Sequence, residues 1–273
     1  MSKRVFIGVG HGGKDPGAVK YVKESEANLQ MALGLKAELE KYGFIVGISR
    51  TREEDDPLYE EIREANAFKP DIAVEVHNNA GGGDGFEVYY QTNGYKAQSM
   101  KLAKCIEDRV KASGQKSRGL KTRLNSSGTD YFGWCREVQA PVVLCEGFFV
   151  DSNDSLDYNT KDKQRAYGAL YALGVMDYFG IRPNPNTGGT TSVVTVPDKT
   201  NYPYSVQVGA LSMKKSAESM YQELRDRGYN VFKQREGSMT IVYVGKFSRA
   251  SDATVTQKDL EKKGYPGFVK KRV

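Results

Sequence analysis

The segment RVFIGVGHGGKDPGA, residues 4–18, decides the fold of the first part of the chain. A short apolar run, Val5–Val9, leads directly into a glycine-rich turn that carries His11. An apolar run of this length next to glycines predicts a buried β-strand, and the glycines let the backbone bend at its tip. We therefore expect a first strand over Val5–Val9, with the His11 imidazole exposed just beyond its carboxyl end.

The rest of the chain up to about residue 180 alternates strand and helix signals. Further strands are predicted over residues 44–49, 72–76, 85–91 and 142–146, and helices through Leu29–Leu39, over Lys96–Ala112 and before Gly180. This alternation is typical of an α/β domain. We expect a twisted mixed sheet flanked by helices.

Composition excludes several classes of protein. The chain is 39% hydrophobic and 27% charged, and no stretch approaches the roughly 18 apolar residues of a membrane span. The first apolar run is too short for a signal-peptide core. These features predict synthesis in the cytoplasm without a signal peptide, and no membrane insertion. The three cysteines, Cys105, Cys135 and Cys145, have no C-x-x-C spacing and are expected to be buried free thiols.

The chain has only two histidines, and both follow predicted strands. His77 comes directly after Ile72–Val76, as His11 comes after the first strand. Ligands of open α/β sheets gather at the carboxyl ends of the strands, so both imidazoles are expected at one edge. Two histidines and a carboxylate form a common catalytic zinc set with a fourth position left for water.

Three carboxylates are candidates for this edge. Glu24 or Glu26, at the start of the first predicted helix, could complete the metal set, and the spacing alone does not choose between them. Glu146 ends the strand predicted over residues 142–146 and could accept a proton from a water molecule. The alternative is structural: hydrogen-bonded histidines at strand ends and a solvated acid at a helix start.

The C-terminal quarter differs in charge and organisation. From Tyr202 onward there are 14 Lys or Arg and 7 Asp or Glu, whereas the whole chain carries a net charge of +6. Residues 182–203 contain four prolines and five threonines, which predicts an interdomain linker. We expect domains at residues 1–181 and 204–273. A basic module attracts polyanions such as nucleic acid, anionic lipid or an anionic cell wall.

An internal repeat runs through this basic part. Residues of one unit recur 36 positions later, in pairs that include Ala217 with Ala253, Leu224 with Leu260 and Gly228-Tyr229 with Gly264-Tyr265. Each unit predicts a strand, an amphipathic helix, a turn and a second strand. Two units give a small α+β domain, βαββαβ, with four strands and two helices on one face.

Four ordered motifs resemble the zinc-dependent N-acetylmuramoyl-L-alanine amidases of bacterial autolysins and phage endolysins. They are HGGKDPGA at residues 11–18, Glu24 four residues before Asn28-Leu29, VHNN at residues 76–79 and PVVLCEGF at residues 141–148. The resemblance covers about residues 4–180. It implies Zn²⁺ held by His11, Glu24 and His77, and thereby selects Glu24 over Glu26.

The resemblance also implies a reaction and substrate contacts. The reaction is hydrolysis of the amide between the lactyl group of N-acetylmuramic acid and L-alanine in peptidoglycan, with Glu146 as the catalytic carboxylate. Asn78 and Arg136 are the expected substrate contacts. A zinc peptidase of the stem peptide is an alternative, because it needs the same activated water. A wall-binding protein without activity is a second.

The repeat resembles a sporulation-related, SPOR-type domain that binds peptidoglycan glycan strands. Tyr204, Gln207 and Tyr243 are its expected wall contacts. Aromatic-bearing βαββαβ sheets also bind RNA, but no RNA-recognition consensus is present, so no nucleic-acid partner is expected. The resemblance implies action on the cell wall after holin release or cell lysis, as a phage endolysin or a mother-cell autolysin.

Overall fold

The computed structural model describes residues 2–181, 204–212, 214–227, 229, 231–247 and 250–271. The chain divides into two compact units, Met1–Val196 and Pro197–Val273. The linker expected over residues 182–203 lies outside the described residues.

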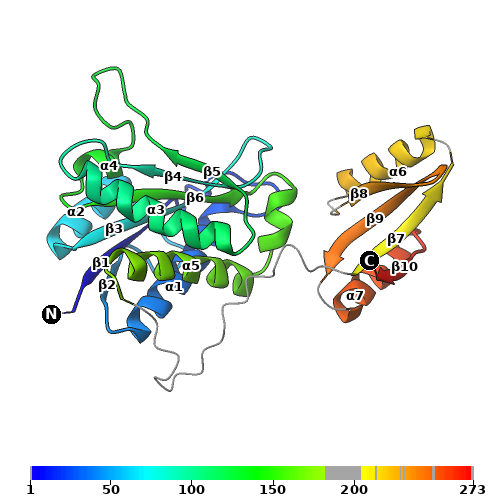
Figure 1. The fold of residues 1–273 in the computed structure, drawn as a ribbon, viewed down its shortest axis with the longest axis horizontal. Coiled ribbons are helices and arrows are strands. Elements are labelled where there is room, and N and C mark those ends of the chain that lie inside the picture. The colour runs from blue at the N-terminus through cyan, green and yellow to red at the C-terminus, as the bar shows by residue number, and fades with distance from the viewer. Residues whose placement is uncertain are drawn as a thin grey trace. The chain divides into compact units, whose positions relative to one another are not determined.

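The first unit is built on a six-stranded mixed sheet with the strand order β2-β1-β3-β6-β4-β5 (Figure 1). Its strands are β1 (Arg4–Val9), β2 (Ile45–Ile48), β3 (Ile72–Asn79), β4 (Phe86–Tyr90), β5 (Ser117–Lys121) and β6 (Val142–Phe149). Its helices are α1 (Glu24–Lys41), α2 (Leu58–Phe68), α3 (Lys96–Ala112), α4 (Gly133–Glu137), the 3₁₀ helix η1 (Asn153–Tyr158) and α5 (Lys161–Tyr178). Neighbouring strands are parallel except β4 and β6, which are antiparallel. The expected mixed α/β sheet is confirmed.

The two faces of this sheet contribute to two separate hydrophobic cores, because alternate residues of each strand point to opposite faces. Val74, Val76, Val143 and Cys145 belong to the larger core, which includes side chains of α1, α3 and α5. Ala73 and Leu144 belong to a smaller core with side chains of α2 and α4. Because successive side chains of a strand point to opposite faces, one strand serves both cores.

Helices α1 and α5 pack closely because glycines face the neighbouring backbone. A Cβ at Gly34 would lie 2.0 Å from the carbonyl oxygen of Arg165, and one at Gly168 would lie 1.8 Å from that of Met31. No side chain fits in either gap, so these glycines set the distance between the helices. Helix α1, which begins at Glu24, packs against β1 and β3.

The predicted elements of the first unit are confirmed in type and nearly in position. Helix α3 has the predicted bounds, Lys96–Ala112. Strands β3 and β6 run three residues further than expected, to Asn79 and Phe149. Helices α2 and α4, the 3₁₀ helix η1 and strand β5 were not predicted. Among the cysteines, Cys135 and Cys145 are buried as expected, whereas Cys105 is half-buried, and all three are free.

The second unit follows the 36-residue repeat. Its elements are β7 (Tyr204–Leu211), α6 (Lys214–Asp226), β8 (Val231–Glu236), β9 (Met239–Phe247), α7 (Ala250–Lys262) and β10 (Phe268–Lys271). They form an antiparallel sheet of order β10-β7-β9-β8. The repeat partners Ala217, Ala253, Leu224 and Leu260 all lie in one core with Val206 and Val244. Both helices therefore cover the same face, and the predicted βαββαβ domain is confirmed.

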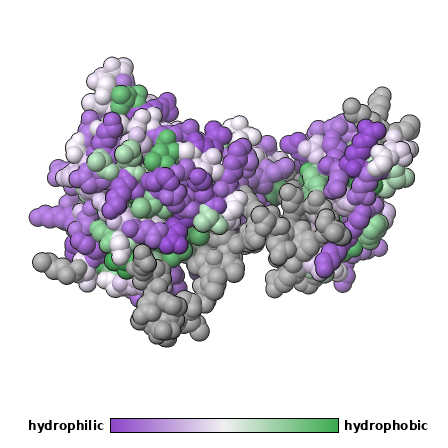
Figure 2. Space-filling model, in the orientation of Figure 1, coloured by the Kyte–Doolittle hydropathy of each residue, from purple (hydrophilic) through white to green (hydrophobic). Residues whose placement is uncertain are grey.

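The visible surface of both units is mainly hydrophilic, with apolar side chains in small, scattered groups (Figure 2). None of the helices in the described part of the chain has the length and apolar character needed to cross a membrane.

Candidate metal centre

The register of β3 and β6 places His77 beside Glu146. The two strands are parallel, and His77 is the pairing partner of Glu146. Both residues lie inside their strands, because β3 and β6 continue to Asn79 and Phe149. Pairing partners on neighbouring strands point to the same face. The side chains of His77 and Glu146 thus stand next to each other on the face that α2 and α4 partly cover.

His11 reaches the same place from the loop after β1. Its backbone has a positive φ of 63°, which is uncommon for a residue other than glycine. Buried side chains hold the loop: Arg50 donates to the carbonyl oxygens of Val9 and Gly10, and Asn28 donates to that of Gly10. These contacts keep His11 in its left-handed conformation and aim its ring at His77, with the ring centroids 4.9 Å apart.

Glu24 is the acid that joins the two histidines. It is the first residue of α1 and is 5% exposed. Its Oε1 lies 3.2 Å from His11 Nε2 and 3.2 Å from His77 Nδ1, and its Oε2 accepts a hydrogen bond from the backbone N–H of Ala18. Glu26, in contrast, is largely exposed and pairs with Lys23. The choice of Glu24 over Glu26 agrees with this geometry.

The donor atoms of His11, Glu24 and His77 all lie within 4.8 Å of one another. Two imidazole nitrogens and one carboxylate oxygen are the protein ligands of many catalytic zinc sites. The second nitrogen of each ring also has a carboxylate beside it: Asp15 Oδ2 is 2.8 Å from His11 Nδ1, and Glu75 Oε1 is 3.4 Å from His77 Nε2. Such outer carboxylates commonly orient metal-binding histidines. The residues present therefore fit a zinc ion.

The ionised Glu24 suits a cation ligand set, whereas His77 has to release a proton when it binds a metal. Burial alone would raise the pKa of the Glu24 carboxyl, but hydrogen bonds with His11 and His77 outweigh it and hold that pKa well below its usual range. Burial likewise lowers the pKa of His77, but its contacts with Glu24 and Glu75 raise it well above its usual value. Glu24 thus stays ionised, as a metal-binding carboxylate must be.

Glu146 is in a different electrostatic position. Its Oε2 is buried and has no hydrogen-bond partner among the described residues. Burial raises the pKa of the Glu146 carboxyl to about 7; the nearby histidines oppose this shift, while Glu24 and Glu87 add to it. A carboxyl group with a pKa near neutrality can both accept and return a proton.

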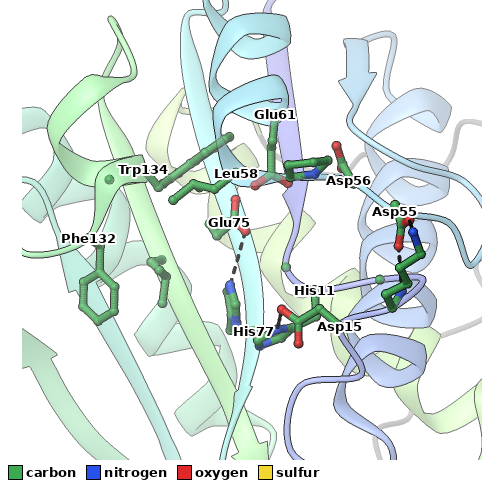
Figure 3. A pocket seen from close by; sticks show the side chains of 16 residues that line it. His11, Asp15, Asp55, Asp56, Leu58, Glu61, Glu75, His77, Phe132 and Trp134 are labelled. Atoms are coloured by element: carbon green, nitrogen blue, oxygen red, sulfur yellow. Dashed lines mark hydrogen bonds and ion pairs between the residues drawn. The ribbon is translucent and has the colours of Figure 1, made fainter.

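A cavity of about 500 Å³ adjoins the two histidines. Figure 3 shows His11 and Asp15 on one side of this pocket, Phe132 and Trp134 on the other, and Glu75 beside the His77 ring. The apolar wall comes from α4 and the loop before it, with Leu58 of α2 and Leu144 of β6. Mainly apolar pockets with a few convergent polar groups are typical of small-molecule and active sites.

Asn78 requires a correction as a substrate contact. It is 3% exposed and points to the face opposite His77. Its amide nitrogen donates to Asn28 Oδ1, and its Oδ1 accepts from the backbone N–H of Phe148. Because neighbouring residues of a strand alternate, a residue next to His77 faces α1 and not the pocket.

Arg136 is exposed on α4 but is not among the residues that line the pocket. Its guanidinium donates to the carbonyl oxygens of Asp130 and Tyr131 and to the Glu137 carboxylate. In this structure Arg136 holds the loop that carries Phe132 into the pocket wall.

Sequence reasoning missed Asp15, Glu75 and Arg50. Asp15 stands in the quoted motif and Glu75 two residues before His77, so the period of a strand could have pointed to Glu75. Arg50 lies 39 residues beyond His11, and only the fold brings its guanidinium to the His11 loop.

The three expected wall contacts of the second unit do not share one surface. Tyr204 packs against the core under the helices. Gln207 and Tyr243 pair on the other face, where Tyr243 is 1% exposed and stacks on Phe232 with ring centroids 5.3 Å apart. Phe268, the partner of Gln207 on β10, is 55% exposed on that face. It was not among the expected contacts.

Two imidazoles and a carboxylate gathered at one edge of an α/β sheet, with a second carboxylate of raised pKa beside them, are typical of metal-dependent hydrolases. The family model for N-acetylmuramoyl-L-alanine amidase matches residues 5–177, and that for the SPOR domain matches residues 200–271. The chain belongs to the N-acetylmuramoyl-L-alanine amidase family, whose members are generally zinc-dependent.

Individual relatives agree with this assignment. A sporulation-specific N-acetylmuramoyl-L-alanine amidase of Bacillus subtilis is 27% identical over 231 residues, which are 83% of this chain and 82% of the relative. An endolysin of Bacillus phage SPP1 is 35% identical over 170 residues, 59% of this chain and 60% of the relative. The crystal structure of an N-acetylmuramoyl-L-alanine amidase from Clostridium difficile 630 matches with a TM-score of 0.58 and 28% identity, covering 67% of this chain and 99% of that one.

Proposed function

We propose that this protein hydrolyses the amide between the lactyl group of N-acetylmuramic acid and the L-alanine of the stem peptide, with zinc held by His11, Glu24 and His77. The observation that carries the proposal is the convergence of three ligand atoms within 4.8 Å, beside Glu146, whose buried Oε2 has no partner in the described part of the chain. Domains at residues 1–181 and 204–273, joined by a linker, are part of the same proposal.

The metal, Glu146 and the apolar wall of the pocket have different roles in the proposed reaction. Zinc, when bound, supplies a Lewis acid that polarises the scissile carbonyl and makes water more acidic. Glu146 accepts the proton of the attacking water and returns it to the nitrogen of the leaving L-alanine. With a pKa of about 7, this carboxyl group can both accept the proton from water and donate it to the leaving nitrogen near neutral pH. The apolar wall of Phe132, Trp134 and Leu144 excludes water from one side of the bond.

The proposal is tested by digesting purified peptidoglycan with native protein, a Glu146→Gln variant and a zinc-stripped sample. Native protein is expected to expose N-terminal L-alanine. The variant is expected to be slower by roughly 10²–10⁴-fold, because it keeps the metal site but has no base.

The zinc content of the Glu146→Gln variant is the control, and it should equal that of native protein. New N-termini other than L-alanine would identify a stem-peptide peptidase instead. If native protein releases no product but still sediments with the wall, only a binding function remains.

The SPOR unit is proposed to hold the enzyme on glycan strands through the sheet face opposite its helices. Gln207 and the exposed ring of Phe268 are paired on that face, and Tyr243 supports it from β9 through its contact with Lys270. Exposed aromatic rings are frequent centres of binding energy.

Replacing Phe268 by alanine is expected to weaken co-sedimentation with peptidoglycan by about fivefold, equivalent to roughly 1 kcal/mol. Val255→Ala is the matched control, because Val255 is 71% exposed on α7, on the helical side of the sheet. Equal binding by both variants would exclude the proposed face.

The relatives act in two settings that their names give, a phage endolysin and a sporulation-specific amidase. We propose the same kind of target, the cell wall, for this chain.

A further inference from the structure

The two histidines face the metal centre with different ring nitrogens. His11 turns Nε2 toward Glu24, and His77 turns Nδ1 toward the same Glu24 oxygen. If zinc binds at the proposed site, each ring has to be held in the orientation that turns this nitrogen to the metal. A ring that binds through Nδ1 must carry its proton on Nε2, and the reverse holds for the other ring.

Glu75 is the group beside the outer nitrogen of His77. Its Oε1 lies 3.4 Å from His77 Nε2, and Figure 3 shows the two side chains in contact along β3. The residues are two apart on one strand, so both point to the pocket face. Glu75 is 1% exposed, and its Oε2 has no hydrogen-bond partner within the described ranges. A buried carboxylate is costly unless it is paired, so such a residue is expected to have a role beyond packing.

Strand β1 leaves room for this pair. A Cβ at Gly8 would lie 1.8 Å from Glu75 Oε2, and a Cβ at Gly10 would lie 2.1 Å from His77 Nε2. Neither glycine has a positive φ, so backbone conformation does not explain them. Two glycines stand where a larger residue would displace the acid or the imidazole. This steric observation is independent of the distance between Glu75 and His77.

We infer that Glu75 is a positioning residue for the metal centre: it accepts the Nε2–H of His77 and thereby presents Nδ1 to the metal. Asp15 does the opposite for His11 by accepting its Nδ1–H. Asp15 has a side chain that is 68% exposed, whereas that of Glu75 is 2% exposed. Charge interactions are stronger away from water, so the contribution of Glu75 is the larger of the two.

The first test measures the zinc affinity of the full chain by competition with a chromophoric chelator. Glu75→Leu is expected to bind zinc roughly 10–100-fold more weakly, the usual loss when an outer carboxylate is removed. Glu75→Gln keeps an acceptor oxygen and is expected to lose only about threefold. Glu107→Gln is the matched control, because Glu107 is a buried acid on α3 that contacts Ser117 and neither histidine.

The second test uses the fact that the chain has only two histidines. Long-range ¹H–¹⁵N spectra of the zinc-loaded protein should show His77 bound through Nδ1 and His11 through Nε2. The Nε2 proton of His77 should exchange with water faster in Glu75→Leu than in native protein. Binding of His77 through Nε2 would overturn the inference, because Glu75 would then have no proton to accept.

The outcomes separate this inference from the proposed function. Native protein that binds no zinc would refute the metal site itself. Native protein that binds zinc no more than twofold better than Glu75→Leu would refute the role of Glu75 alone. An equal loss in Glu75→Leu and Glu107→Gln would show a general effect of removing buried acids and would overturn the inference as well. If Glu75→Leu does not fold, Glu75→Gln and the spectra of native protein still decide.

Discussion

The two faces of β3 and β6 differ in what their side chains do, although both faces belong to the same two strands. On one face Val74, Val76 and Cys145 fill the core under α1, α3 and α5. On the other face, one residue further along each strand, stand His77 and Glu146. Because the side chains of a strand alternate, neighbouring residues of one strand have different roles: one packs in the core and the next lies at the candidate metal centre.

The difference arises from how far helices cover each face. Helices α1 and α5 pack closely over the first face through Gly34 and Gly168. On the second face α2 and α4 cover only part of the sheet, and a cavity of about 500 Å³ remains next to His77. Polar residues of the second face reach this cavity, whereas a polar residue of the first face must find partners inside the protein.

The largest effects are expected from two neighbouring substitutions on opposite faces. His77→Ala should reduce activity to that of zinc-stripped protein, because a ligand is lost. Asn78→Ala should instead cost about 2–3 kcal/mol of unfolding free energy, since Asn28 and the Phe148 N–H lose a buried partner.

Zinc content, activity and denaturant unfolding of both variants provide the measurements. The folded fraction of Asn78→Ala should bind zinc as native protein does. If Asn78→Ala lost activity at full stability, Asn78 would be a substrate contact after all, and the comparison of the faces would fail.

A smaller effect is expected from pH. The pKa of Glu146 is raised to about 7, and the carboxylate form is the one that accepts a proton. The ratio kcat/KM should therefore fall as the pH decreases through this region, by up to tenfold per pH unit. Bound zinc adds positive charge, which favours the carboxylate and moves the midpoint to 7 or below. A pH profile that is flat from 5 to 8 would argue against Glu146 as the base.

The smallest effect is expected at Cys145, the neighbour of Glu146 on the packed face. Cys145 is fully buried in the larger core. Cys145→Ala removes one buried sulfur atom and should cost about 1 kcal/mol of unfolding free energy, with kcat unchanged. A large loss of kcat at unchanged stability would show that the two faces are coupled.

The repeat unit was the easiest part of the fold to predict. Its two halves carry the same apolar positions 36 residues apart, and α6 and α7 begin 36 residues apart as well. The binding surface of this unit was harder to predict. Tyr204 and Gln207 lie three positions apart on one strand, and the sequence did not show that they point to opposite faces. The pairing of Gln207 with Phe268 joins residues from opposite ends of the unit.

In the catalytic unit, prediction failed where elements are short or their pattern is weak. Helix α4 has five residues and strand β5 reads SRGLK, so neither has a clear apolar period. Helix α2 carries alternating charges that obscure its buried Ile62 and Ala65. Helix α3, with regularly spaced apolar residues, was predicted with its observed bounds.

The α/β order, the repeat and the motifs that resemble an amidase could be predicted from the sequence, because they depend on local periodicity and on spacing along the chain. The folded structure was needed to see which nitrogen of each histidine faces Glu24, that Asn78 is buried and that Glu75 lies against His77 in the space left by Gly8 and Gly10. Those properties depend on strand register and on contacts between distant segments, which form only when the sheet assembles.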